Sequence, residues 1–473
     1  MKHLGTDYLV IGSGTSGLAF VDTLIDHTDA HVTIVDRHGK PGGHWNDAYP
    51  FVTLHQPSAF YGVNSLPLGS GLKDRVGLNQ GLAELASGAD INSYFDRVMN
   101  QRLLPSGRVS YHPMSNYLGE GVFQSLLSGA KTQVTVRKKT VDANYFGPRV
   151  PSTHQRRFEV APGVAVVAPN ALPGLGNQAA DSPVPQRYVV LGAGKTAMDA
   201  CIWLLQSGVE AERVQWVVPR DSWLVNRLTT QNGPEFFDEA IGSQAHQMEA
   251  FAKASSTEDL FLRLEACGAV LRIDPGRLPG MFHLATVSTA EVAVLARVHD
   301  VVRLGRVRSL QSHRMVLQHG EVAVEPGSLF IDCTASAVEP RPTQTVFQGD
   351  KMVLQMLRLP QPAFSAATIA YVEAHDEAYP DTASKNAVCA TVPFPYALAD
   401  DPPSVALGMQ NQYRWGQDKA LRQWMRDSRL DGFGRLMSSV DPADTEMQAV
   451  LARYKAGAMA AMTKLPRLMG AGR

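Results

Sequence analysis

Residues 7–36, DYLVIGSGTSGLAFVDTLIDHTDAHVTIVD, decide the fold of this chain. An apolar run of strand character opens the stretch. Three glycines in the spacing G-x-G-x-x-G follow it, and they are Gly12, Gly14 and Gly17. A helical pattern of apolar residues comes next, and then a second apolar run that ends in Asp36. The stretch therefore predicts a strand, a helix and a second strand, the βαβ unit that binds a dinucleotide.

Each part of this unit has a physical reason in dinucleotide binding. The first glycine permits a tight turn, the second lets backbone reach a pyrophosphate, and the third brings helix and strand close together. The helix N-terminus offers partial positive charge to the pyrophosphate, and the acid accepts a hydrogen bond from a ribose hydroxyl. We therefore expect Thr15 and Ser16 in the turn, and Asp36 and Arg37 after the second strand, to contact the dinucleotide.

Composition narrows the function classes. The chain has 473 residues, 44% hydrophobic and 19% charged, which fits a globular enzyme of two or three domains. Its 44 Lys and Arg balance 45 Asp and Glu, so no nucleic-acid partner is expected. The four cysteines lack any C-x-x-C, which argues against a disulfide framework, a zinc site and a redox-active dithiol. No signal peptide and no apolar stretch of about 18 residues is recognised, so we expect a cytoplasmic protein without a membrane span.

The loop after the first unit carries a further motif. Residues 41–45 form P-G-G-x-W, and a Y-P pair follows at residues 49–50. Together with the first glycine fingerprint and its acid, this pattern resembles the flavin-containing monooxygenases and the related Baeyer–Villiger monooxygenases. The resemblance is close over residues 1–70 and loose beyond them. It implies that the first fingerprint binds FAD and that the loop lies along this cofactor through Gly43, His44 and Trp45.

The residues after this loop are the candidates for chemistry at the flavin. The resemblance implies a polar residue beside the flavin at this point of the chain. The region holds a histidine, a glutamine and a serine, which we take as catalytic candidates: His55, Gln56 and Ser58. The family's usual asparagine or aspartate is not clearly present. N- or S-oxygenation, Baeyer–Villiger insertion and hydroxylation therefore all stay open.

A second fingerprint occupies residues 187–220, RYVVLGAGKTAMDACIWLLQSGVEAERVQWVVPR. Its strand pattern runs into two glycines and an alanine, which are Gly192, Gly194 and Ala197. Alanine is accepted at the third position because only a small residue is needed where helix and strand pack. The G-K-T that follows is not a GxxxxGK[ST] phosphate loop, because Val189 stands where that motif needs its first glycine.

The end of this second unit predicts the coenzyme. Arg220 follows the second strand at the point where an NAD site carries an acid. An arginine here can pair with the 2′-phosphate of NADP, and Lys195 at the mouth of the turn can add a second cation. Thr196 completes the residues that we expect to contact NADP.

We expect an α/β fold with two Rossmann-like dinucleotide-binding domains, the second inserted in the first, and a helical C-terminal region. The expected FAD domain, NADPH domain and C-terminal region are residues 1–170 with 326–400, residues 185–325, and residues 401–473. A buried strand pattern at residues 328–336 stands where the resembled family returns to its FAD domain, so Asp332 and Thr334 are expected to line the cofactor. No metal site is expected.

These features indicate an NADPH-dependent FAD monooxygenase acting on a small organic substrate and O2. The resemblance implies that NADPH reduces FAD by hydride transfer. Reduced flavin would then add O2 to give a flavin peroxide, which passes one oxygen atom to the substrate. An FAD oxidase or dehydrogenase of a small metabolite and a flavin-binding protein without oxygenase activity stay open as alternatives. A disulfide reductase is disfavoured by the missing C-x-x-C, and a homodimer stays open.

Overall fold

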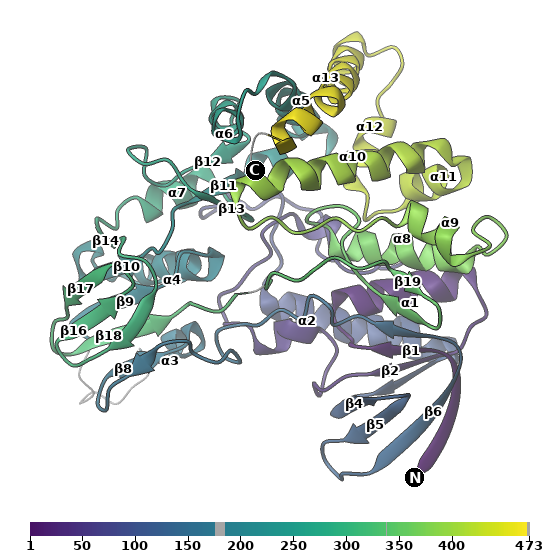
Figure 1. Ribbon diagram of the computed structural model, residues 1–473, viewed down its shortest axis with the longest axis horizontal. Helices are drawn as coiled ribbons and strands as arrows, with labels where there is room; N and C mark the ends of the chain where they lie inside the picture. The colour runs from purple at the N-terminus through teal and green to yellow at the C-terminus, as the bar shows by residue number, and fades with distance from the viewer. Residues whose placement is uncertain (176–184, 337, 471–473) are drawn as a thin grey trace.

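The computed structural model describes residues 1–175, 185–336 and 338–470. The chain builds two sheets that lie apart from each other, with helices packed against both (Figure 1). The N-terminal strands form the sheet at the lower right of Figure 1, and the middle of the chain forms the sheet at the left. The C-terminal helices lie above the first sheet and its helices, on the side where the α13 label stands.

The first sheet contains strands from both halves of the chain. They are β1 (Lys2–Ile11), β2 (Val32–Val35), β3 (Val109–His112), β4 (Ser115–Gly119), β5 (Val122–Ser125), β6 (Lys131–Asp142), β19 (Phe347–Gln348) and β20 (Lys351–Val353). Their order is β19-β20-β6-β1-β2-β3, and the hairpin β4–β5 attaches through β6. Because β20, β6, β1, β2 and β3 run parallel, their carboxyl ends meet at one edge of the sheet.

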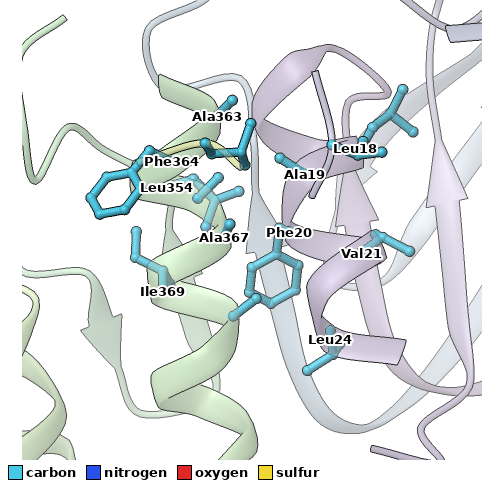
Figure 2. Packing of buried hydrophobic residues seen from close by; sticks show 14 of the residues in the cluster. Leu18, Ala19, Phe20, Val21, Leu24, Leu354, Ala363, Phe364, Ala367 and Ile369 are labelled. Carbon is cyan, nitrogen blue, oxygen red and sulfur yellow. The ribbon is translucent and has the colours of Figure 1, made fainter. Parts of the chain in front are cut away.

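Two helices pack together on this sheet. Helix α1 (Thr15–His27) begins directly after Gly14, and α8 (Pro362–Ala374) lies beside it (Figure 2). Helix α8 is apolar around its whole circumference, the pattern of a helix that is covered on every side. Figure 2 shows ten residues of the shared core: Leu18, Ala19, Phe20, Val21, Leu24, Leu354, Ala363, Phe364, Ala367 and Ile369.

The second sheet is made of parallel strands alone. They are β8 (Ala165–Val167), β9 (Arg187–Leu191), β10 (Val214–Val217), β14 (Asp300–Val302) and β18 (Ser328–Asp332), in the order β14-β10-β9-β18-β8. Helix α4 (Lys195–Gln206) follows β9 as α1 follows β1. Both glycine-rich units are thus β-strand, turn, helix and β-strand. The predicted α/β fold with two Rossmann-like domains is confirmed.

Two strands lie in a different sheet from the one that the predicted boundaries imply. Those boundaries assign residues 165–167 and 328–332 to the first domain, yet both β8 and β18 pair in the second sheet. Strand β18 lies beside β9, with Asp332 opposite Leu191. A short apolar strand shows only that it is buried, and its sequence pattern does not name its neighbour.

Smaller elements complete the chain. A four-stranded sheet packs on the second sheet: β7 (Glu159–Val160), β15 (Val307–Leu310), β16 (Arg314–Leu317) and β17 (Gly320–Ala323). A three-stranded sheet follows β10: β11 (Ser222–Asn226), β12 (Val270–Leu271) and β13 (Met281–Val287). The remaining helices before residue 400 are α2 (Gly88–Arg97), α3 (Leu172–Leu175), α5 (Ser243–Lys253), α6 (Thr257–Ala266), α7 (Thr289–Leu295) and α9 (Thr382–Val388).

The C-terminal region is helical. Its helices are α10 (Asp401–Gln417), α11 (Lys419–Asp427), α12 (Gly432–Ser438) and α13 (Thr445–Gly470). Trp415 of α10 packs edge-on against Phe364 of α8, so this region also covers the first domain. Helix α13 packs along α5 of the second domain. Within the described ranges, no helix combines the length and the apolar character that crossing a membrane requires.

Candidate active-site cleft

One cleft of about 2130 Å³ takes in both glycine turns. It is lined by most of the residues that the sequence predicts, namely Gly14, Thr15, Ser16, Asp36, Arg37, Gly43, His44, Trp45, His55, Gln56, Gly192, Gly194, Lys195, Thr196, Arg220 and Thr334. Four other predicted residues, Gly12, Gly17, Ser58 and Asp332, are not part of this lining. The cleft therefore joins the carboxyl edges of two separate sheets, which is where open α/β folds bind their ligands.

The G-G-x-W loop packs against the first glycine turn. Gly12 has a φ of +108°, and its N–H donates to the carbonyl of Val35 at 2.9 Å. A Cβ on Gly17 would stand 2.1 Å from the Gly12 oxygen, so Gly17 allows helix and strand to pack. A Cβ on Gly43 would stand 3.0 Å from the Cα of Gly14. The turn thus presents bare backbone at the N-terminus of α1, which fits a pyrophosphate.

A chain of side chains fastens the G-G-x-W loop to this turn. The indole N–H of Trp45 donates to the hydroxyl of Tyr61 at 2.7 Å, and that hydroxyl is hydrogen-bonded to Thr15. Burial raises the pKa of Tyr61 to about 12, so the phenol stays protonated at neutral pH. The role of Tyr61 is not predicted from the sequence, because no motif around it in the chain indicates a contact with Thr15.

The acid after β2 is held by several donors. One carboxylate oxygen of Asp36 accepts from the backbone N–H of Ser13 at 2.5 Å and from its hydroxyl at 2.9 Å. The other accepts from the backbone N–H of His38 at 2.8 Å and contacts its Nδ1 at 3.0 Å. Burial alone would raise the pKa of Asp36, but the hydrogen bonds from His38 and Ser13 outweigh it and lower the pKa.

The second turn is surrounded by charges instead. The ammonium of Lys195 pairs with Asp199 and lies 3.3 Å from Glu291. The guanidinium of Arg227, which is fully buried, lies 2.6 Å from the other oxygen of Glu291. Burial would raise the pKa of Glu291, yet these two cations lower it to about 2. Lys195 therefore already has two carboxylate partners within the chain, and its contact with a coenzyme phosphate stays a prediction.

Arg220 differs from Lys195 in its surroundings. It is exposed, follows β10 directly, and lines the cleft. Across residues 1–175, 185–336 and 338–470, no carboxylate forms an ion pair with it, whereas its neighbour Asp221 pairs with Arg303 at 3.0 Å. Arg220 is thus an exposed cation in the cleft lining, and its contact with a coenzyme phosphate stays a prediction.

The three catalytic candidates fall into two groups. His55 and Gln56 line the cleft, but Ser58 does not. Burial, together with the charge of Lys195, lowers the pKa of His55 to about 4, so its imidazole is neutral at neutral pH. The Ser58 hydroxyl donates to the carbonyl of Glu84 at 3.0 Å and accepts from a backbone N–H at 2.8 Å. Ser58 fastens one loop to another, which corrects its assignment to the chemistry.

The stretch that carries His55 also joins the two domains. The hydroxyl of Tyr49 donates to Asp199 at 2.6 Å, and Phe51 stacks on Trp203 at 5.4 Å between ring centroids. The guanidinium of Arg227 donates to the carbonyl of His55 at 3.2 Å. Residues 49–55 therefore belong to the first domain in sequence and are held by the second domain in space.

Asp332 and Thr334 lie at the second turn and not beside the first. Asp332 is buried at the end of β18, where it contacts His154 at 3.0 Å and Arg156 at 3.2 Å. Thr334 donates its hydroxyl to Asp332 at 2.7 Å and lines the cleft. Strand β18 belongs to the second sheet, and the contact of these two residues with FAD stays a prediction. Among the residues that the structure places, no cluster of His, Cys, Asp and Glu is arranged to hold a metal ion.

Comparison with known proteins agrees with this architecture. Residues 10–64 match the family described as NAD(P)-binding Rossmann-like domain. The protein named "Uncharacterized protein Rv2000" from Mycobacterium tuberculosis (strain ATCC 25618 / H37Rv) is 45% identical over 470 residues, covering 99% of this chain and 86% of the relative. This chain belongs to the Rv2000 family. "Uncharacterized protein Mb2023" from Mycobacterium bovis (strain ATCC BAA-935 / AF2122/97) matches with the same identity and coverage.

A solved structure shares the fold. The polycyclic ketone monooxygenase from the thermophilic fungus Thermothelomyces thermophila superimposes with a TM-score of 0.52 at 11% identity, covering 97% of this chain and 89% of that chain. The likeness shows a common fold over almost the whole length.

Proposed function

We propose that the protein is an FAD- and NADPH-dependent monooxygenase that acts on a small organic substrate and O2 in the cytoplasm. The observation that carries the proposal is that two dinucleotide turns from separate sheets open into one cleft. Two dinucleotides bound in this way would meet between the domains, where His55 and Gln56 lie. The fold shared with a polycyclic ketone monooxygenase supports the same reaction class.

The first turn is the proposed FAD site. Its bare backbone at Gly14 and Gly43 leaves room for a pyrophosphate, and Asp36 and Arg37 stand at the adjacent strand end. The hydrogen bonds from Trp45 through Tyr61 to Thr15 fix the loop that would lie along the cofactor. The residues that are present therefore fit FAD.

The second turn is the proposed NADPH site. Among the residues that the structure describes, none apart from the two chain neighbours of Gly194 has an atom within 4 Å of a Cβ built on it, so the N-terminus of α4 is open toward the cleft. Arg220 provides the cation for a 2′-phosphate, and it does so without the help of Lys195. An aspartate in the place of Arg220 would repel that phosphate, so the exposed guanidinium favours NADPH over NADH.

The chemistry is divided between the cofactors and the chain. Bound flavin and NADPH supply the hydride transfer and the activation of O2. The hydrogen bonds from Tyr49 to Asp199 and from Arg227 to the carbonyl of His55 join the two domains and would thereby keep the two ligands in a fixed relative position. The stretch between the domains would exclude water from the reacting groups. His55 remains uncharged at neutral pH, so its imidazole can donate or accept one hydrogen bond, and Gln56 adds an amide donor.

Spectroscopy of the purified protein tests the proposal. A flavin spectrum should be present, should bleach on anaerobic addition of NADPH, and should return on addition of O2 with coupled oxygenation of an accepted ketone, amine or sulfide. Bleaching by a substrate in place of NADPH would indicate an oxidase or dehydrogenase. A flavin that NADPH does not reduce would indicate a binding protein, and a colourless protein that does not take up FAD would refute the proposal.

A further inference from the structure

One histidine near the first turn lies between two carboxylates. His38 follows β2 closely, and its Nδ1 lies 3.0 Å from Asp36 while its Nε2 lies 2.8 Å from Asp47. Only 16% of the side chain is exposed. A neutral imidazole carries one N–H, so it can donate to only one of the two acids, whereas the protonated ring can donate to both. With both acids ionised, only the imidazolium can donate a hydrogen bond to each of them.

The groups around His38 indicate that it is the cation shared by Asp36 and Asp47. The hydrogen bond that His38 donates to Asp36 is the largest cause of the raised pKa of His38, and the bond that it donates to Asp47 adds to it against the opposing effect of burial. Burial lowers the pKa of His44 to about 4, so that neighbour is neutral. Charged groups on the same loop are Arg37 and Lys40, which are both exposed. On the adjoining strand β3, burial lowers the pKa of His112 and raises that of Tyr111 to about 12.

Asp47 connects this pair to the loop that is proposed to lie along FAD. It is the last residue of the one-turn helix that carries Gly43, His44 and Trp45. Its backbone carbonyl also accepts from Ser152 at 2.6 Å and from Asn170 at 3.2 Å. Through Asp47, the imidazolium ties the strand end at Asp36 to both the cofactor loop and the start of the second domain.

The same bonds control what Asp36 can offer to a ligand. A carboxylate has about four acceptor positions, and Ser13 and His38 together supply four donors. A ribose hydroxyl must therefore replace one of them. The Ser13 hydroxyl is the one with another partner, because the phenol oxygen of Tyr111 lies 3.4 Å away. His38 remains hydrogen-bonded to the other carboxylate oxygen of Asp36 during this exchange.

We propose that His38 is a positioning residue for FAD, and that the protein holds FAD less tightly as His38 loses its proton. The inference rests on the proposed assignment of the first turn to FAD. Loss of the proton removes one of the two bonds and makes the net charge of the Asp36, His38 and Asp47 group more negative, from −1 to −2. The carboxylates then repel each other and the cofactor's pyrophosphate, and the cofactor loop loses its connection to β2.

The sign of the pH dependence follows from the direction of the pKa shift. Because the folded protein stabilises the imidazolium, the contribution of His38 is fully present at low pH and is lost as the pH rises through its raised pKa. The lowered pKa of Asp36 places its titration at more acidic pH than this step, and the raised pKa of Tyr111 places its titration at more alkaline pH. Binding of FAD should therefore weaken over a pH range that lies above the ordinary histidine pKa of about 6.5.

Release of flavin from the purified holoprotein tests the inference. The protein is diluted into buffers across that pH range, and the rise in flavin fluorescence gives the dissociation constant. We expect the dissociation constant of the unmutated protein to increase about tenfold as the pH rises. In His38→Gln, binding should be weak and the dissociation constant should be independent of pH. The matched control is His31→Gln, an exposed histidine at the other end of β2, which should retain the unmutated pH profile.

Further outcomes keep the two proposals apart. The variant Asp47→Asn removes one carboxylate, so the pH at which FAD is released should fall, and this test remains if His38→Gln does not fold. Two results would overturn only the role of His38 and leave the proposed function intact. One is FAD binding that does not change with pH in the unmutated protein, and the other is an unchanged pH dependence of FAD binding in His38→Gln. A protein that binds no FAD at any pH would overturn both this inference and the proposed function.

Discussion

The two glycine turns have almost the same backbone and very different side-chain surroundings. Gly12 and Gly192 both have a positive φ, +108° and +122°, and each donates to the strand beside it, at 2.9 Å and 3.0 Å. At the first turn a carboxylate is held by neutral donors and an imidazolium, and at the second turn Lys195 is held by two carboxylates. The glycine motif fixes where a pyrophosphate can sit, and the side chains around it decide which dinucleotide is accepted.

The residues after the second strand of each unit add to the difference between the two turns. The first unit ends in the buried acid Asp36, and the second ends in the exposed Arg220. An acid suits a ribose hydroxyl, whereas a cation suits a ribose phosphate. The same backbone unit can thus serve two cofactors within one chain. The difference also predicts that equivalent substitutions in the two turns have separate effects.

The largest effect is expected from blocking one turn at a time. A Cβ on Gly14 would stand 3.6 Å from the Cα of Gly43, so the methyl groups of Gly14→Val would reach into the space left for the pyrophosphate. We expect this variant to be colourless and free of FAD. Gly194→Val should remain yellow but should not be reduced by NADPH. Absorbance spectra with and without NADPH measure both, and a normal flavin content in Gly14→Val would contradict the assignment.

The next largest effect separates the two arginines of the second domain. Arg227→Met would leave Glu291 buried with one cation fewer, and breaking a buried ion pair costs about 3–5 kcal/mol. Arg220→Met changes an exposed side chain and should alter the stability by less than about 0.5 kcal/mol. Denaturant midpoints of the two variants make the comparison. Equal midpoints would show that the charges around the second turn do not hold the domain together.

A moderate effect is expected on the choice of coenzyme. Removing the charge-assisted contact in Arg220→Ala should cost about 1.5–3 kcal/mol of binding to the 2′-phosphate. The preference for NADPH over NADH should then fall by about ten- to a hundredfold. Anaerobic flavin reduction with each coenzyme measures the ratio. If the unmutated protein were reduced equally by both, Arg220 would have no role in the preference.

The smallest effect concerns the stretch between the turns. Gln56→Leu and His55→Ala each remove a neutral hydrogen-bonding group worth about 1 kcal/mol, so hydrogen peroxide released per NADPH should rise about fivefold. The rate of reduction by NADPH should change little. Ser58→Ala is the matched control, because its hydroxyl faces the backbone near Glu84 and not the cleft. Unchanged peroxide release in both cleft variants would place the oxygen-handling group elsewhere.

The sequence reveals the parts of the site that are made by local chain geometry. The two fingerprints, Asp36 and Arg220 were predicted because each stands at a fixed distance from a strand and a turn. The partners of Lys195 were missed: Asp199 is one helical turn away and could have been noticed, but Glu291 comes from a different helix. The contact between His38 and Asp47 and the sheet of β18 were missed for the same reason, since both depend on tertiary pairing.

The order of the strands along the chain has a consequence for synthesis on the ribosome. All strands of the second sheet lie between residues 165 and 332, whereas the first sheet needs β19 and β20, at residues 347–353, to complete one side. Helix α8, which covers the apolar face of α1, begins only at Pro362. A nascent chain therefore contains the complete second sheet while the core around Phe20 is still uncovered. The domain that begins the chain is the one whose folding must wait for its last third.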